Sequence, residues 1–157
     1  MRIGITGHRG LTTELEAQVR QLLEDALPNA ASSTITLVSC IADGPDSWLA
    51  EIALKRGAQL EVIVPADQYR DGLPEWHHPT YDRLFDRATA VHRTGHLESE
   101  ETAHLAGGEL LVDHIDKLFA VWDGLPARGQ GGTADVVAYA RQRGVPIEVI
   151  WPKGARR

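Results

Sequence analysis

The chain has 157 residues, of which 43% are hydrophobic and 24% are charged, and its formal net charge is −6. We expect one domain over residues 1–157 with a sizeable core and no membrane partner, because no apolar run approaches the roughly 18 residues of a membrane span. Scattered lysines and arginines on an acidic chain predict no nucleic-acid partner. A single cysteine, with no leader segment before the first apolar run, predicts a cytoplasmic protein.

Apolar, β-branched runs alternate with helical patterns along the chain. The expected strands are residues 2–6, 34–39, 60–65, 90–92, 118–122 and 147–151. The first expected helix begins near Thr13, with Thr12 or Thr13 as its N-cap, and the others cover residues 47–57, 79–88, 99–114 and 134–143. Two segments show neither pattern. We interpret residues 67–79 as an irregular surface excursion and residues 153–157 as a frayed tail.

This alternation predicts an α/β fold, a doubly wound, Rossmann-like three-layer sandwich with a mainly parallel sheet. With the strands at 2–6, 34–39, 60–65, 118–122 and 147–151 numbered one to five, the expected core order is 3-2-1-4-5. The order reverses between strands one and four, so we expect a ligand crevice at the carboxyl ends of these two strands.

Two glycine-containing turns lead from a strand into a helix at this crevice. Gly7-His-Arg-Gly10 follows the first strand, and a glycine-rich segment from Asp123 to Asp135 follows the fourth. Backbone N–H groups at a helix N-terminus attract an anion, most often a phosphate. Arg128 can add a positive charge, and Thr133 can cap the helix or contact the anion. The alternative is a connection whose glycines only permit tight packing.

The candidate ligand-binding residues come from the ends of these strands and from the turns. They are Gly7, His8, Arg9, Ser39, Gly44, Asp123, Arg128, Gly131, Gly132 and Thr133. Asp123 ends a buried strand at the crevice and is the best-placed carboxylate, with loop capping as its alternative role. Glu100 and Glu101 open a helix, where carboxylates ordinarily interact with the helix dipole.

Histidine and cysteine offer weaker signals. His77-His78 has no third ligand at a matching spacing, so we expect no metal site and a solvated loop there. Cys40 is expected to be a small buried apolar residue. Asp46 is interpreted as the N-cap or first-turn acid of its helix.

Four short segments, in order along nearly the whole chain, carry a family resemblance. They are Gly4-Ile-Thr-Gly-His-Arg9, Ser39-Cys-Ile-Ala-Asp-Gly44-Pro-Asp46, Leu118-Phe-Ala-Val-Trp-Asp-Gly124 and Gly131-Gly-Thr-Ala-Asp135. Together they resemble the SLOG superfamily, the Rossmann-like domains related to the LOG cytokinin-activating phosphoribohydrolases and to the Smf/DprA DNA-processing proteins. The resemblance implies a nucleotide or nucleotide-derived ligand.

The chain departs from the enzymes of this group at their catalytic positions. LOG enzymes carry a Gly-Gly-x-Gly-Thr-x-x-Glu motif, and aligning Gly132-Thr133 with it puts Val136 at the catalytic Glu. Their Arg–Lys pair falls at about Gly107-Gly108. The nucleoside deoxyribosyltransferases look similar too, and their nucleophilic Glu also aligns with Val136. Asp135 is one residue away, which is about 100° around a helix.

The leading functional expectation is a binding or sensor domain for a nucleotide or nucleotide-derived phosphorylated ligand, with no cofactor. The alternative is an N-glycosidic hydrolase or transferase that acts on a nucleoside monophosphate, with Asp123, Glu100 or Glu101 as its carboxylate.

We also expect a homo-oligomer, because two-fold dimers are the commonest assemblies and related LOG proteins are dimers. Gly107-Gly108 would let the 99–114 helix approach either the domain's own sheet or a second subunit.

Overall fold

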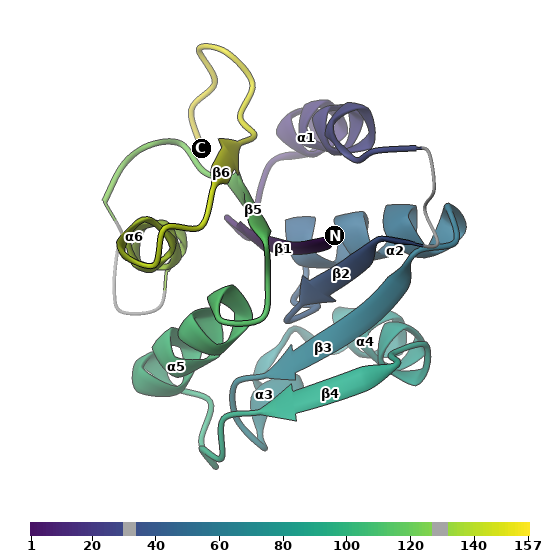
Figure 1. The fold of residues 1–157 in the computed structure, drawn as a ribbon, viewed down its shortest axis with the longest axis vertical. Helices are drawn as coiled ribbons and strands as arrows, with labels where there is room; N and C mark the ends of the chain where they lie inside the picture. Colours follow the sequence, from purple (N-terminus) through teal and green to yellow (C-terminus); the bar gives the residue numbers. More distant parts are fainter. Residues whose placement is uncertain (30–33, 127–131) are drawn as a thin grey trace.

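A computed structural model of the chain describes residues 1–29, 34–126 and 132–157, and its centre is one six-stranded parallel sheet (Figure 1). The strands are β1 (Arg2–Gly7), β2 (Thr36–Ser39), β3 (Gln59–Val64), β4 (Ala90–Arg93), β5 (Lys117–Val121) and β6 (Ile147–Val149). Their order is β4-β3-β2-β1-β5-β6. This confirms the expected core order, to which β4 adds a parallel edge strand beside β3.

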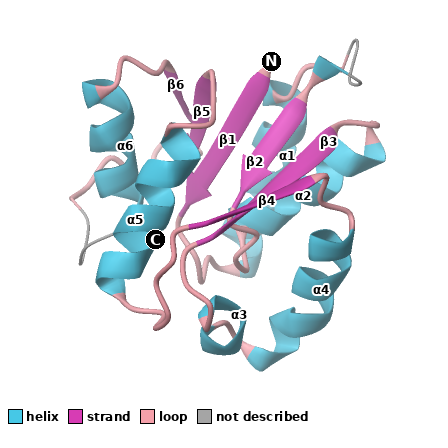
Figure 2. Ribbon diagram, turned by 60° about the horizontal axis from the view of Figure 1, so that its bottom comes forward, coloured by secondary structure: helices cyan, strands magenta, loops and turns pink. Residues whose placement is uncertain are grey.

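Helices cover both faces of the sheet (Figure 2). On one face lie α1 (Thr13–Ala26), α2 (Pro45–Lys55) and α4 (His78–Asp86), and on the other lie α5 (Glu101–Val112) and α6 (Thr133–Gln142). Successive strand residues serve the two layers in turn, since Leu37 packs on the α1 and α2 side and Val38 on the α5 and α6 side. The three-layer Rossmann-like prediction is therefore confirmed.

Local sequence explains where the first helix begins. The Thr12 hydroxyl accepts the Leu15 backbone N–H at 3.2 Å, so Thr12 is the N-cap of α1. Glu14 and Glu16 lie in the first turn, where their charges favour the helix dipole.

Two sequence interpretations of irregular segments were wrong. Residues 67–79 contain α3 (Tyr69–Gly72) and a 3-10 helix, η2 (Glu75–His77), and both Tyr69 and His77 are buried. His77 lies in the interior, with Nε2 2.9 Å from the Ile41 carbonyl oxygen. The segment after β6 is also ordered by contacts, because Trp151 Nε1 donates to the Ala155 carbonyl at 3.0 Å.

The two glycines of α5 lie against the chain itself. A Cβ at Gly107 would meet the ring of Pro65, and one at Gly108 would meet Val136. The close approach predicted from the sequence is thus internal, and these glycines do not face a second subunit. The dimer itself stays a prediction.

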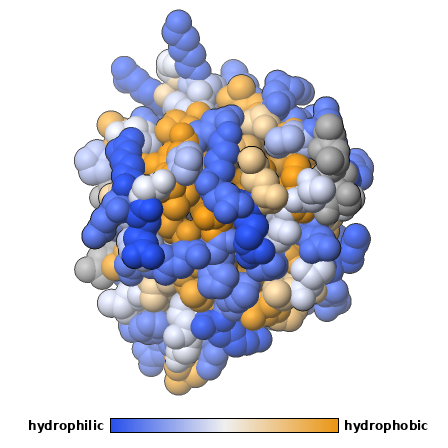
Figure 3. All heavy atoms as spheres, viewed as in Figure 1, coloured by the Kyte–Doolittle hydropathy of each residue, from blue (hydrophilic) through white to orange (hydrophobic). Residues whose placement is uncertain are grey.

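Polar side chains dominate the face of the molecule that Figure 3 shows, around a smaller central group of apolar ones. No helix in the described part of the chain is long and apolar enough to cross a membrane.

A charge cluster joins three strands, β1, β3 and β4. The Arg2 guanidinium donates two hydrogen bonds to Glu61, at 2.9 and 2.6 Å, and His92 Nε2 lies 2.8 Å from the same carboxylate. The Arg2 hydrogen bond is the largest influence on Glu61, and with His92 it outweighs burial and lowers the pKa of Glu61 to about 2. Arg2 Nε also donates to the carbonyl of His114, which links the segment between α5 and β5 to β1.

We expect Glu61→Gln to lower the free energy of unfolding at pH 7 by roughly 1 kcal/mol, since the pair is only partly buried and solvent screens it. Because the folded pKa is depressed, this stabilisation is complete above about pH 4.5 and is lost as the pH falls toward 2. Urea unfolding at several pH values should show the two proteins converging near pH 2. Glu16→Gln, in an exposed pair with Arg20, is the control. A gap that persists unchanged at pH 2 would contradict the assignment.

Candidate functional site

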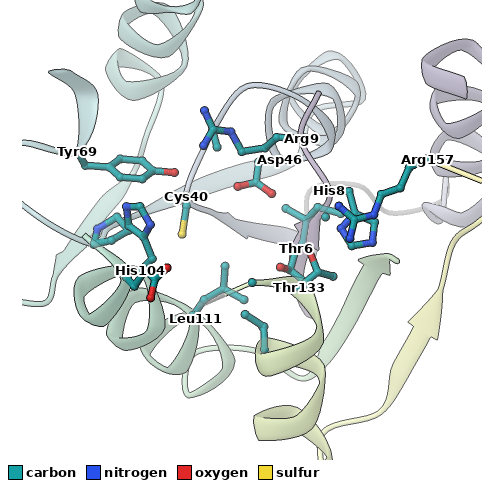
Figure 4. Close-up of a pocket in the computed structure, with 18 residues that line it drawn as sticks. Thr6, His8, Arg9, Cys40, Asp46, Tyr69, His104, Leu111, Thr133 and Arg157 are labelled. Carbon is teal, nitrogen blue, oxygen red and sulfur yellow. The ribbon is translucent and has the colours of Figure 1, made fainter. Parts of the chain in front are cut away.

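A cavity of about 380 Å³ opens at the carboxyl edge of the sheet, where the strand order reverses between β1 and β5 (Figure 4). Eighteen of the described residues line it. They come from β1 and the turn after it, from the segments after β2 and β3, from α2, α3 and α5, from the start of α6 and from the segment after β6. The predicted crevice therefore exists, and it has the volume of a small-molecule site.

The first turn of α6 forms one end of the cavity. Gly132 is the N-cap and has no side-chain capping bond, and Thr133 follows it as a buried residue of the cavity wall. Gly7, His8 and Arg157 line the cavity as well, and Figure 4 shows His8, Thr133 and Arg157 on the same side. This end combines a helix N-terminus with a guanidinium, an arrangement that favours an anion.

Arg9 belongs to the cavity but is engaged elsewhere as well. Its guanidinium pairs with Asp43, with Nη2 to Oδ1 at 2.7 Å, and 46% of its side chain is exposed. Arg9 therefore lies at the rim, where a ligand can compete for its donors. The predicted contacts Arg128 and Gly131 lie outside the described residues.

The opposite end of the cavity is less polar. Cys40, Pro65, Tyr69 and Leu111 line it, and His104 adds an imidazole whose Nε2 lies 2.8 Å from Ser99 Oγ. Burial raises the pKa of both the Cys40 thiol and the Tyr69 phenol, and burial lowers the pKa of His104. These groups are therefore uncharged near neutral pH. Cys40 packs against both hydrophobic core clusters, as expected of a small buried apolar residue, and it also lines the cavity.

Asp46 lies between the two ends, and Figure 4 shows its carboxyl group pointing into the cavity. Burial raises its pKa to about 7, against the opposing effects of a hydrogen bond from the Ala42 backbone and of the Arg9 charge. The turn that holds Asp46 is fixed by two serines. Ser39 Oγ donates to the Asp46 carbonyl at 3.1 Å, and Ser47 Oγ donates to the Ala42 carbonyl at 2.6 Å.

The carboxylate of Asp123 contacts other groups of the protein and does not face the cavity. Arg157 Nε donates to its Oδ2 at 2.7 Å, the Leu125 backbone N–H donates to its Oδ1 at 3.0 Å, and His8 Nε2 lies 3.2 Å from that Oδ1. Burial alone would raise the pKa of Asp123, but these hydrogen bonds outweigh it and lower the pKa to about 2. Asp123 fixes the positions of His8 and Arg157 and does not line the cavity.

The remaining predicted residues divide between the cavity and its supports. Glu101 lines the cavity, whereas the exposed Glu100 is the N-cap of α5. Ser39 and Gly44 stay outside the lining. Gly44, at φ +100°, begins α2 and brings its backbone close to that of Arg9. In the described part of the chain, no group of three or more His, Cys, Asp and Glu residues is arranged to hold a metal ion.

Most of the residues that line the cavity were not predicted as ligand contacts, and among these are Cys40, Asp46, Tyr69, His104 and Arg157. Asp46 had a usable signal, since it follows Gly44-Pro45 at the start of a helix that faces the crevice. The position of Arg157 depends on a contact with Asp123, which is 34 residues earlier in the chain.

In sequence, the chain matches none of the protein-family profiles and none of the curated proteins with which it was compared. Solved structures with a similar fold include DNA processing protein A from Helicobacter pylori, described with its single-stranded DNA binding mode (17% identity, TM-score 0.71, 95% of this chain and 64% of that one). Another is DprA from Streptococcus pneumoniae (14% identity, TM-score 0.66, 94% of this chain and 49% of that one). A third is a molybdenum cofactor binding protein from Rippkaea orientalis (17% identity, TM-score 0.61, 94% of this chain and 74% of that one).

These similarities show a Rossmann-like fold, as predicted from the sequence, and it is the fold that DprA and the molybdenum cofactor binding protein share. The chain spans just under two thirds of the first DprA chain and about half of the second. The similar structures also correct the expectation that the protein has no nucleic-acid partner. Proteins with this fold include one described with a single-stranded DNA binding mode, so the exclusion of a nucleic-acid partner was wrong. Net charge is a property of the whole chain and does not describe a local site.

Proposed function

We propose that this chain binds a nucleotide or nucleotide-derived phosphorylated ligand in the cavity at the carboxyl edge of the sheet. The observation that carries the proposal is the two-ended character of one cavity, with the α6 N-terminus and Arg157 at one end and mostly uncharged side chains at the other. A nucleotide has the same division, with a charged phosphate at one end and a flat, weakly polar base at the other.

The phosphate is assigned to the α6 end. The free N–H groups of a helix N-terminus and its dipole favour an anion there. The Arg157 guanidinium uses Nε for Asp123, and a guanidinium has five N–H donors in all, so further donors can serve the phosphate. Because Asp123 holds that guanidinium in position, less side-chain entropy is lost when the ligand binds.

The base is assigned to the end lined by Cys40, Tyr69 and Leu111. These side chains supply apolar contact area, and the Tyr69 hydroxyl adds a polar atom that points into the cavity (Figure 4). Ligand sites commonly combine an apolar lining with a few polar groups of this kind.

Isothermal titration with AMP and GMP, each paired with its nucleoside, tests the proposal. We expect the monophosphates to bind at least tenfold more tightly than the nucleosides, because phosphate contacts are charge-assisted hydrogen bonds. The preference should shrink in high salt, since Arg157 is only partly buried. Equal binding of nucleotide and nucleoside, or no binding of either, would contradict the proposal.

Single-stranded nucleic acid is a second candidate ligand, favoured by the fold shared with DprA. A strand could present one of its nucleotides to the cavity, and the exposed indole of Trp76 offers a surface on which a base can stack. Titration with a labelled oligonucleotide, in competition with a mononucleotide, distinguishes the two candidates. Competition indicates a shared site.

An N-glycosidic enzyme is the remaining alternative. Asp46 and Glu101 are the carboxylates that line the cavity, whereas Val136 lines it at the position of the related enzymes' Glu. Chromatography of the titrated samples would detect free base, and its release at an enzymatic rate would favour this alternative over simple binding.

A further inference from the structure

The carboxyl group of Asp46 is a polar group that faces the cavity without a cationic partner. Among the described residues, no Lys, Arg or His lies within ion-pair distance of it, and the nearby Arg9 pairs with Asp43 instead. The bond from the Ala42 backbone satisfies only part of the carboxylate, which can accept about four hydrogen bonds. A ligand that donates hydrogen bonds to the Asp46 carboxylate would satisfy its remaining acceptor positions and stabilise its charge.

The surroundings of Asp46 limit the shape of that occupant. Cys40 and Tyr69 lie close to it, and Figure 4 shows the Tyr69 hydroxyl and the Asp46 carboxyl group directed toward the same part of the cavity. Both neighbours are uncharged near neutral pH because burial raises the pKa of each. The site therefore offers a carboxylate among uncharged side chains, which suits a flat ring that donates hydrogen bonds.

A carboxylate has two parallel acceptor oxygens, and two adjacent N–H donors on a ring edge match them. Guanine has such an edge in its N1–H and 2-amino groups. Adenine instead presents one donor beside one acceptor, which matches a protonated carboxyl group. Discrimination between the two bases would thus depend on whether Asp46 is ionised.

We propose that Asp46 is the specificity-determining residue of the cavity and that its carboxylate accepts two hydrogen bonds from the donor–donor edge of a guanine-type base. This inference rests on the proposed nucleotide-binding function and adds the class of base. It assigns the ring to the Asp46, Cys40 and Tyr69 part of the cavity and leaves the phosphate at the α6 end.

Besides Asp46 itself, several neighbouring groups can make nucleotide binding depend on pH. The charged and titratable groups around it are Arg9 after β1, Cys40 and Asp43 after β2, Tyr69 of α3, and Glu101 and His104 of α5. AMP and GMP carry the same phosphate and meet the same neighbours. The ratio of their affinities therefore isolates the group that contacts the base.

Titration calorimetry with GMP and AMP at pH 6, 7 and 8 tests the inference on the wild type, Asp46→Asn and Asp86→Asn. We expect the wild type at pH 8 to bind GMP roughly 10- to 100-fold more tightly than AMP, as expected for hydrogen bonds to a charged group. This ratio should fall between pH 8 and 6 as Asp46 takes up a proton. In Asp46→Asn it should be at or below one at every pH, because an amide offers one donor and one acceptor, which match the edge of adenine and not the two donors of guanine.

Asp86 is exposed at the end of α4, so Asp86→Asn removes the same charge away from the cavity and should behave as the wild type. Equal affinities for GMP and AMP in the wild type at pH 8, or a preference that Asp46→Asn leaves unchanged, would overturn the inference while the proposed function stands. If neither nucleotide binds, both fail.

Discussion

Replacing Arg157 by alanine is expected to weaken the binding of a nucleoside monophosphate by roughly 10- to 100-fold, the loss typical of a charge-assisted hydrogen bond to a phosphate. Arg157 lines the cavity beside Thr133 and is held in place by Asp123, with 18% of its side chain exposed. The nucleoside, which lacks the phosphate, should lose little affinity. Titration calorimetry with both ligands measures the difference.

Arg156→Ala is the matched control, because it removes the same charge from the exposed neighbouring residue. Thermal melts of both variants would show whether the Asp123 region stays folded without its Arg157 partner. Equal losses in the two variants would mean that Arg157 acts only through the overall charge. An equal loss for nucleotide and nucleoside would remove Arg157 from the phosphate site.

Replacing Gly107 by alanine is expected to lower the free energy of unfolding by roughly 1–3 kcal/mol, the usual cost of overpacking a core. The new Cβ would lie 2.7 Å from Pro65 Cγ and 3.2 Å from Pro65 Cα, and a proline ring attached to its own backbone cannot move aside. In an open helix interior the same change would be favourable by about 1 kcal/mol, because alanine is the better helix former.

Gly108→Ala is the control for this prediction. Its Cβ would meet one methyl group of Val136 at 2.7 Å and no other atom closer than 3.8 Å, so a small shift of one side chain relieves the contact. Urea unfolding should therefore rank the wild type and Gly108→Ala close together, with Gly107→Ala well below. A Gly107→Ala protein as stable as the wild type would contradict the internal packing, and light scattering on the same samples would report the assembly state.

The sheet could be predicted from the sequence because its signal is local. The run from Leu118 to Trp122 is continuously apolar, and the structure shows β5 over Lys117–Val121 with four of its five residues buried. Parallel strands covered on both faces require such runs. The short β4 was also predicted, although its residues alternate between half-buried and exposed at the edge of the sheet.

The location of the crevice was predictable for a topological reason. Once the strand order was inferred, the reversal between β1 and β5 fixed the edge at which a ligand site forms. Gly7 ends β1 and Thr133 begins α6, the helix that follows β5, so both could be placed at this edge from the sequence.

The residues that were missed depend on contacts distant in the sequence or on backbone turns. Tyr69 belongs to a four-residue helix, which is too short to show a period. Asp46 has the sequence pattern of a helix-capping acid, and its direction depends on the turn that Ser39 and Gly44 shape. Asp123 seemed free at a strand end because the sequence gives no sign that Arg157 pairs with it.

The most direct test of the account is a crystal structure of the protein with GMP. We expect electron density in the cavity at the carboxyl edge of the sheet, with the phosphate at the Gly132–Thr133 start of α6 and beside Arg157, and with the base edge against Asp46. Nucleotide density only outside this cavity, or a phosphate bound at the Cys40 and Tyr69 end, would contradict it.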